Sequence, residues 1–132
     1  MSHYTSIQTK MADLEALTYA VESMGFKVKV GKNQSLYNYL GEKTSLTADL
    51  VIPKRQITSA SNDIGFSQEN DGTYKLIISD YDKTIPKTRD FPEQIKQRYA
   101  YFKVKKELML ENKEIIQEKI HDNGIIEIVV EG

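Results

Sequence analysis

The sequence contains no cysteine among its 132 residues. This absence excludes disulfide frameworks, zinc sites held by thiolates, iron–sulfur clusters and cysteine nucleophiles. A chain of this length can bury a sufficient core without such cross-links, and it suits one domain spanning residues 1–132. An enzyme built on this chain would depend mainly on carboxylates and on two histidines.

A strong charge of either sign is also missing, because 18 lysines and arginines stand against 19 aspartates and glutamates. The net charge of −1 argues against a strongly basic nucleic-acid-binding protein. The N-terminus lacks the pattern of a signal peptide, and apolar runs such as Ile128–Val130 fall far below the ~20 residues of a membrane helix. We therefore expect a soluble, cytoplasmic protein without membrane contacts.

Common catalytic loops are absent as well. The sequence has no Gly-x-Ser-x-Gly elbow, no Walker loop and no Gly-x-Gly-x-x-Gly turn. These absences argue against a serine hydrolase and against nucleotide hydrolysis. We expect neither a cofactor nor a catalytic residue of the standard classes.

The first half of the chain predicts one helix among strands. Leu14, Leu17 and Val21 recur at helical spacing, with Asp13 as a candidate N-cap and Gly25 as a candidate C-terminal stop. Apolar and basic residues alternate from Phe26 onward, as in a half-buried strand, whereas the segment from residue 33 to 47 is less regular. The expected elements are a strand over 4–10, a helix over 12–24, and strands over 26–30 and 48–52.

The second half predicts a hairpin and a longer helix. Asn70-Asp71-Gly72 is a strong turn signal between two apolar alternating segments, 64–68 and 74–78. After a charged connector over 80–89, Asp90 and Pro92 indicate the start of a helix that runs to about Glu111.

Projection of this long helix gives two apolar strips. The first strip contains Phe91, Ile95, Tyr99, Phe102 and Met109. Lys106 falls on the same face and must extend to solvent or find a partner. Tyr101, Val104 and Leu108 form the second strip, with Arg98 and Lys105 between the two. Two strips indicate packing on two sides, against a sheet and against something else.

The C-terminal segment predicts a second hairpin around Asp122-Asn123-Gly124. A three-residue loop pairs Ile120 with Ile126 and Ile116 with Val130, and is preferred over a two-residue turn because it places apolar residues opposite one another. The alternative is that the helix continues through residues 114–121.

These elements follow the order β-α-β-β-β-β-α-β-β. This order is typical of an α+β domain in which two helices cover one face of a mainly antiparallel sheet.

Several segments resemble one known family. They are Met-Ser-His-Tyr at the N-terminus, Asp13-Leu14-Glu15-Ala16-Leu17, Asp63-Ile64-Gly65-Phe66-Ser67, Gln97-Arg98-Tyr99-Ala100-Tyr101 and the glycine-centred terminal hairpin. Together they resemble the hypothetical chloroplast open reading frame thirty-five family, an uncharacterised plastid, cyanobacterial and bacterial domain of unknown function. The resemblance spans nearly the whole chain and implies no established activity.

The chain also departs from this family. Asp80-Tyr81-Asp82 replaces an aromatic-rich segment, residues 42–62 form a longer segment, and the chain ends in Val-Val-Glu-Gly. These differences favour a non-plastid bacterial member. The resemblance to bacterial members weakly implies an AAA-type ATPase as a partner.

Besides a protein contact, the residues suggest two other kinds of functional site. Asp80 and Asp82, with His3 or His121, offer carboxylate and imidazole groups to a small metal-dependent enzyme, although aspartate is already favoured in turns. Lysine clusters offer an RNA-binding surface, although glutamates at helical spacing interrupt the second cluster. The clusters are Lys27, Lys29 and Lys32, and Lys96, Arg98, Lys103, Lys105 and Lys106.

The interpretation that we favour is a non-catalytic protein-binding or assembly module. Arg98 is either an interface anchor or a buried-stem arginine paired with a strand carboxylate such as Asp63 or Asp80. The expected contact surface, for a homodimer or another protein, consists of Arg98, Tyr101, Val104, Lys105 and Leu108.

Overall fold

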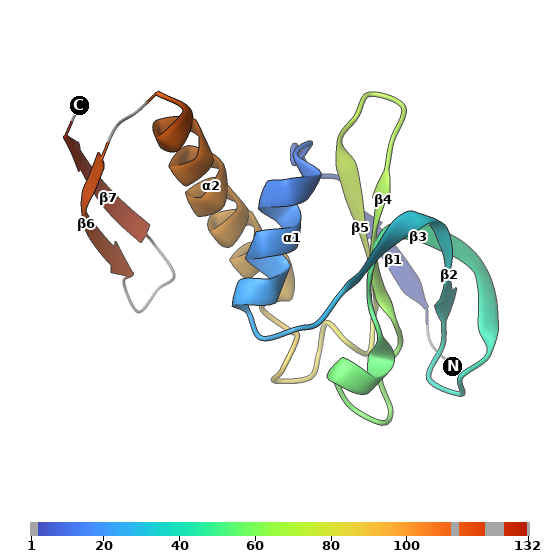
Figure 1. Ribbon diagram of the computed structural model, residues 1–132. Helices are drawn as coiled ribbons and strands as arrows, with labels where there is room; N and C mark the ends of the chain where they lie inside the picture. The colour runs from blue at the N-terminus through green and yellow to red at the C-terminus, as the bar shows by residue number, and fades with distance from the viewer. Residues whose placement is uncertain (1–2, 112–113, 121–125, 132) are drawn as a thin grey trace.

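Five antiparallel strands form the main sheet, in the spatial order β1-β5-β4-β3-β2 (Figure 1). The structure is a computed structural model that describes residues 3–111, 114–120 and 126–131. The strands of this sheet are β1 (Tyr4–Ile7), β2 (Lys29–Tyr37), β3 (Lys43–Ile52), β4 (Ile64–Gln68) and β5 (Tyr74–Ser79). A 3-10 turn, η1 (Lys54–Gln56), follows β3.

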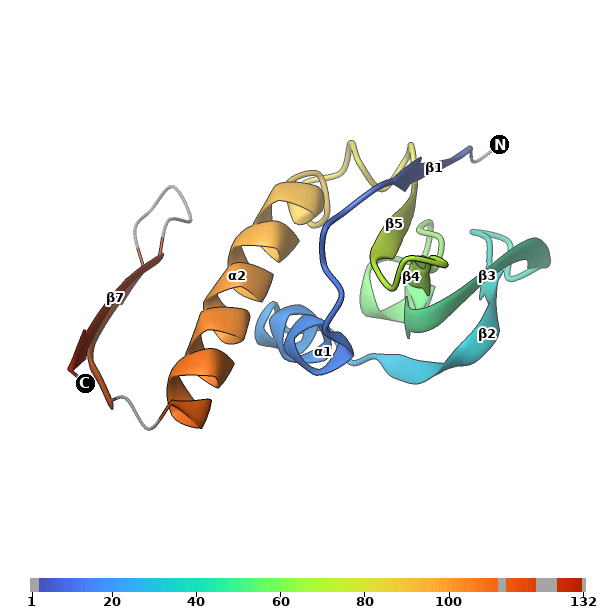
Figure 2. The same cartoon turned by 90° about the horizontal axis from the view of Figure 1, so that it is seen from above.

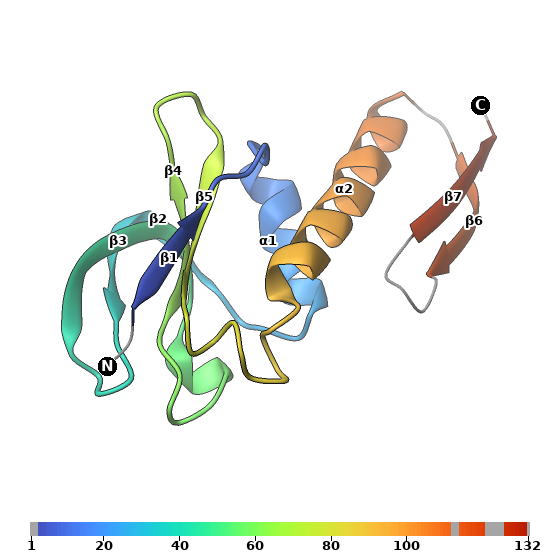
Figure 3. The same ribbon diagram turned by 180° about the vertical axis from the view of Figure 1, so that it is seen from behind.

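Two helices cover one face of the sheet, and a separate hairpin lies beyond them. Helix α1 (Leu14–Ser23) and helix α2 (Phe91–Leu110) are in contact with each other. The hairpin of β6 (Glu114–Ile120) and β7 (Ile126–Glu131) lies on the side of α2 away from α1 (Figures 2 and 3). The element order predicted from the sequence and the α+β class are confirmed.

Helix α1 begins and ends where the local signals indicate. The Asp13 side chain accepts a hydrogen bond from the Ala16 backbone N–H at 3.1 Å, which satisfies one of the unpaired donors of the first turn. Gly25 follows the helix at φ 93°, a left-handed conformation that glycine adopts without a steric penalty. Leu17 and Val21 are fully buried against the sheet and α2.

The hairpin of β4 and β5 supplies the centre of the core. Its turn brings Gly72 to φ 90°, as the Asn-Asp-Gly signal predicts. Phe66 on β4 is fully buried and lies 6.1 Å, centroid to centroid, from the ring of Phe91 at the start of α2. The sheet and both helices therefore share one hydrophobic core.

The segment after α1 differs from the sequence expectation. The expected strand over 26–30 starts later, at Lys29, and the irregular segment from 33 to 47 contains most of a β2–β3 hairpin. Register shifts between Val30 and Gln34, and left-handed Asn33 at φ 53°, interrupt the alternation on which strand prediction depends. Val30 is exposed because it lies on this bulged edge strand.

The second face of the sheet carries a smaller apolar cluster, which leaves no room for a side chain at Gly65. Val51 and Ile77 pair with Gly65 from the two neighbouring strands, and Leu36 packs over it. A Cβ atom on Gly65 would lie 2.6 Å from the Cβ of Ala48. The Tyr4 hydroxyl of β1 donates to the Tyr37 carbonyl of β2, so the sheet curls until its two edge strands meet.

Helix α2 follows the predicted apolar strip for only half of its length. Phe91 and Ile95 are buried in the core, whereas Met109 remains 68% exposed because the helix extends beyond the sheet and α1 (Figure 1). Helical periodicity thus predicted which face of α2 is apolar, but not how much of that face other elements cover. Asp90 precedes the helix as expected, but its side chain makes no capping hydrogen bond.

The C-terminal segment is a hairpin and not a continued helix. Ile120 pairs with Ile126, as the preferred register predicts. Val130 pairs with Ile115 and not with Ile116, because an irregularity lies between Ile115 and Gln117. The expected turn at residues 122–124 lies outside the described residues.

Candidate functional site

Asp13 joins the two helices electrostatically. Its Oδ2 atom accepts hydrogen bonds from Lys106 at 2.9 Å and Lys103 at 3.2 Å, while its Oδ1 atom caps α1. The hydrogen bond from Lys106, with help from the Ala16 N–H and Lys103, lowers the pKa of Asp13 to about 2. Lys106 also lies 3.3 Å from Glu15, so this lysine of the apolar strip does find partners.

Arg98 takes a structural role that neither sequence hypothesis named. Its guanidinium donates to the backbone carbonyl and the hydroxyl of Ser23, at 3.2 and 3.1 Å, at the end of α1. A cation beside the last carbonyls of a helix is favourable. The proposed pairing with Asp63 or Asp80 is wrong, because Asp63 accepts from backbone N–H groups of Tyr37 and Lys54, and Asp80 pairs with Lys83.

Tyr101 and Lys105 face the hairpin of β6 and β7. The Tyr101 hydroxyl donates to Glu118 of β6 at 2.5 Å, and Lys105 Nζ lies 3.2 Å from that hydroxyl and 3.5 Å from Glu118. Burial and the hydrogen bond with Glu118 raise the pKa of Tyr101, and the same hydrogen bond lowers the pKa of Glu118. These contacts form a polar latch, defined here as Tyr101, Lys105 and Glu118, between α2 and the hairpin.

The expected contact surface is therefore divided among several surroundings. Arg98 turns to α1, Tyr101 and Lys105 turn to β6, Leu108 is half-buried, and Val104 is 42% exposed. The sequence predicted that the second strip packs against something other than the sheet, and Tyr101 and Lys105 contact β6 of the same chain. The expected contact with another protein stays a prediction.

An apolar groove lies between α1 and the second half of α2, where the sequence predicted a contact role for Lys105 alone among the lining residues. Its volume is about 540 Å³. Tyr19 is 53% exposed and Leu110 is 76% exposed, and the Tyr19 ring lies 6.0 Å from the ring of Phe102. We call this the helical groove; its walls include Ala16, Tyr19, Phe102, Lys105, Met109 and Leu110.

The carboxylates considered for catalysis are not brought together. Strand β5 ends at Ser79, so Asp80 and Asp82 do not share a strand face. Asp80 is exposed beside Lys83, whereas Asp82 is fully buried and accepts from the Ser79 hydroxyl at 2.7 Å and the Asn62 N–H at 3.1 Å.

The rest of a metal or acid–base centre is not found around them. The described part of the chain contains no group of three or more histidine or acidic side chains placed to hold a metal ion. His3 is exposed, and His121 lies outside the described residues. Asp82 thus acts in a buried polar cluster that anchors the connector to Asn62, with its Oδ1 atom lacking a partner among the residues described.

The second lysine cluster is largely engaged within the molecule. Lys103 and Lys106 contact Asp13, Lys105 contacts Glu118, and Lys96 lies 3.7 Å from Glu93. The acidic partners offset the positive charge that a phosphate backbone would need.

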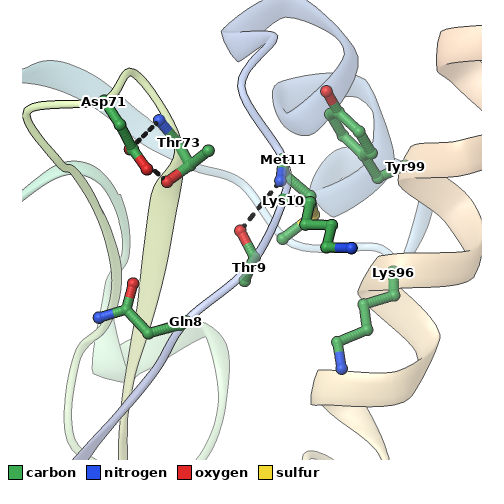
Figure 4. A pocket seen from close by; sticks show the side chains of 8 residues that line it. All are labelled: Gln8, Thr9, Lys10, Met11, Asp71, Thr73, Lys96 and Tyr99. Atoms are coloured by element: carbon green, nitrogen blue, oxygen red, sulfur yellow. Dashed lines mark hydrogen bonds between the residues drawn. The ribbon is translucent and has the colours of Figure 1, made fainter.

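A second pocket, of about 660 Å³, opens between three segments (Figure 4). Residues 8–11 after β1, the β4–β5 turn and α2 form its walls, and Lys10 and Lys96 line it from opposite sides. We call it the lysine pocket. Sequence reasoning missed it because three segments far apart in the chain form it. Lys96 was counted in the second lysine cluster, and no pattern connected it with Lys10.

Comparison with known proteins gives a family without an assigned activity. A family model described as a protein of unknown function, DUF1257, matches residues 20–129. An uncharacterized protein ycf35 of Cyanophora paradoxa is 32% identical over 132 residues, covering 99% of this chain and 97% of that protein. A second uncharacterized protein ycf35, of Pyropia yezoensis, is 27% identical with the same coverage.

No solved structure matches the chain. Among the residues described, no helix is long and apolar enough to span a bilayer. The family match covers most of the chain, and the relatives carry the name implied by the resemblance found in the sequence. The chain therefore belongs to the DUF1257 family of proteins of unknown function.

Proposed function

We propose that this chain is a non-catalytic protein-binding module and that the helical groove is its contact surface. The observation that carries the proposal is the exposure of large apolar side chains at one place. Met109 is 68% exposed, Leu110 is 76% exposed and Tyr19 is 53% exposed. Isolated exposed apolar residues are normal on protein surfaces, but a contiguous group beside a groove is typical of an interaction site.

The shape of this surface favours a helical segment of a partner. Two packed helices form the walls of the helical groove, and an amphipathic helix can lay its apolar face between them. Met109 suits such a contact because its unbranched side chain adapts to irregular surfaces. Lys105, Lys106 and Glu15 form a charged margin of the groove. Lys106 is already paired with Glu15, and Lys105 with Glu118, so the apolar side chains carry the proposed contact.

This surface is a revision of the one expected from the sequence. Of the expected residues, Lys105 lines the helical groove, whereas Arg98 and Tyr101 are engaged with Ser23 and Glu118. Arg98 and Tyr101 connect α2 to α1 and to β6, and the proposed contact surface lies nearer the last turn of α2.

The alternatives receive less support. A metal-dependent enzyme using Asp80 and Asp82 would require the two carboxylates to converge, but one is exposed and the other is buried. RNA binding by the second lysine cluster would require its cations to leave Asp13 and Glu118. Protein binding requires no rearrangement of the described side chains.

The test is a comparison of two surface leucines. Leu110→Glu places a charge in the helical groove, while Leu40→Glu places the same charge at the β2–β3 turn, where Leu40 is 63% exposed. Affinity purification with quantitative mass spectrometry should show a partner that Leu110→Glu loses and Leu40→Glu retains. An AAA-type ATPase is the first candidate partner to titrate directly. Equal recovery of every co-purifying protein by both variants would contradict the proposal.

A homodimer is a separate outcome of the same design. Light scattering of the wild-type protein over a range of concentrations gives its mass in solution. A dimer that Leu110→Glu dissociates and Leu40→Glu preserves would identify the partner as a second copy of this chain.

A further inference from the structure

The lysine pocket differs in chemistry from the helical groove, although α2 contributes to both. Its volume of about 660 Å³ lies within the range of pockets that hold small molecules. Figure 4 shows the ammonium groups of Lys10 and Lys96 in the space between the segment after β1 and α2. Two cations from separate elements thus face one concave space.

Neither cation is strongly committed to a carboxylate. Lys10 forms no ion pair with any residue that the structure describes. Lys96 lies 3.7 Å from Glu93, beyond hydrogen-bond distance, and both side chains are largely exposed. Such exposed pairs contribute little, so Lys96 can turn to a bound anion at low cost.

The carboxylate that lines the pocket is engaged elsewhere. Asp71 Oδ1 accepts from the hydroxyl of Thr73 at 2.6 Å and from its backbone N–H at 2.9 Å, and these bonds lower the pKa of Asp71 (Figure 4). Its charge therefore stays on the β4–β5 turn, away from the two lysines. The side of the pocket between Lys10 and Lys96 is left positive.

Part of the remaining wall is apolar and well supported, beside the polar side chains of Gln8, Thr9 and Thr73. Met11 is buried, and its backbone carbonyl accepts from the Tyr74 N–H at 2.7 Å. Tyr99 is held because its hydroxyl oxygen accepts from the backbone N–H groups of Ala12 and Asp13, at 3.2 and 3.1 Å. An occupant would therefore meet a fixed apolar surface beside two adjustable cations.

We propose that the lysine pocket binds a small organic phosphate. One phosphate dianion can be shared by the ammonium groups of Lys10 and Lys96, because charge-assisted hydrogen bonds to phosphate are a favoured use of lysine. Inorganic phosphate alone would leave most of a 660 Å³ pocket unfilled, whereas the organic part of the ligand would cover Met11 and Tyr99.

The experiment uses adenosine monophosphate as the probe, and ¹⁵N-edited NMR of the full chain monitors its binding. Amide shifts should move at Lys10, Met11, Thr73 and Lys96. Adenosine should leave them unchanged, and inorganic phosphate should bind more weakly. Lys10→Gln or Lys96→Gln should weaken binding by about tenfold, the loss expected for one charge-assisted hydrogen bond. Lys43→Gln, an exposed lysine on β3, should bind as the wild type does.

Three outcomes would overturn the proposal. The first is the absence of shifts at these amides up to millimolar probe. The second is shifts spread over all lysines and insensitive to Lys10→Gln and Lys96→Gln. The third is citrate binding as tightly as adenosine monophosphate, which would show selection for charge alone. Because Lys10 and Lys96 do not line the helical groove, failure here leaves the proposed protein-binding function untouched.

Discussion

Two regions of this molecule are held together by different forces. In the central core, the sheet, α1 and the first half of α2 bury large apolar side chains such as Leu17, Phe66 and Ile95 completely. In the distal region, residues 101–110 of α2 and the hairpin of β6 and β7 meet through the polar latch, and Met109 and Leu110 are exposed. Helix α2 thus passes through both regions, buried in the core at its start and exposed at its end.

The comparison of the two regions separates the residues that should stabilise the fold from the exposed apolar residues of the proposed contact surface. Burial of apolar area is the main favourable term in folding, so the central core should carry most of the free energy of unfolding. A two-stranded hairpin has little stability by itself, and its latch consists of partly exposed polar groups. The distal region can therefore present apolar side chains without the fold depending on them.

The largest contrast is expected between two leucines. Leu17→Ala, in the buried face of α1, should lower the free energy of unfolding by about 2–5 kcal/mol. Leu110→Ala, at a position 76% exposed, should change it by less than about 0.5 kcal/mol. Urea unfolding followed by circular dichroism measures both, and a Leu110→Ala cost equal to that of Leu17→Ala would remove the distinction between the regions.

A second contrast concerns two glycines of the same sheet. Gly65→Ala should cost about 1–3 kcal/mol, because its new Cβ would overlap the Cβ of Ala48. Gly31→Ala is the matched control, since the nearest atoms to its Cβ belong to the Gln34 side chain at 3.7 Å. Thermal unfolding should show a lower melting temperature for Gly65→Ala alone; equal melting temperatures would mean that β3 and β4 move apart easily.

Asp13 lies at the border between the regions, and its effect depends on pH. Its folded pKa of about 2 lies below the ordinary value of about 3.9, so the ionised carboxylate stabilises the fold above about pH 4. This contribution is lost as the pH falls through 2. Asp13→Asn, which keeps a capping oxygen, should cost about 1–2 kcal/mol at neutral pH, given partly exposed lysine partners.

The measurement for Asp13 is the urea midpoint of wild type and Asp13→Asn between pH 2 and 7. The difference between the two proteins should shrink as the pH falls from 4 toward 2. A difference that stays constant over this interval would show that the charge of Asp13 does not join the helices.

The smallest effect is expected in the polar latch. Tyr101→Phe removes the hydroxyl that donates to Glu118 and should lower global stability by less than about 1 kcal/mol. Hydrogen exchange in residues 114–120 should nevertheless become faster, because the hairpin loses a contact with α2. Tyr81→Phe, at an exposed tyrosine of the connector, is the control. Unchanged exchange in Tyr101→Phe would show that other contacts hold the hairpin.

The same two regions explain what the sequence could and could not predict. Local chemistry was sufficient for the helix cap at Asp13, the left-handed Gly25 and the turn at Gly72. The strands over 26–30 and 48–52 were predicted, but their extension into the segment from 33 to 47 was not, because Asn33 and the register shifts after Val30 hide the alternation. These errors arise where tertiary contacts, and not local preferences, determine the backbone.

The candidate site was harder to predict for a related reason. Helical periodicity placed Met109 on the core face, but it does not reveal that α2 extends beyond the sheet, which leaves Met109 uncovered. The target of Arg98, the end of α1, follows from how two helices cross. The lysine pocket depends on three separate segments, which no local pattern connects.

Native-state hydrogen exchange of the unmodified protein tests the central claim most directly. Amides of β3, β4, β5 and α1 should exchange only through global unfolding, whereas amides of β6 and β7 should open at a much lower free energy. Equal opening free energies in the sheet and in the hairpin would show that the distal region is part of the same cooperative unit. That result would contradict an account in which one region provides stability and the other is reserved for binding.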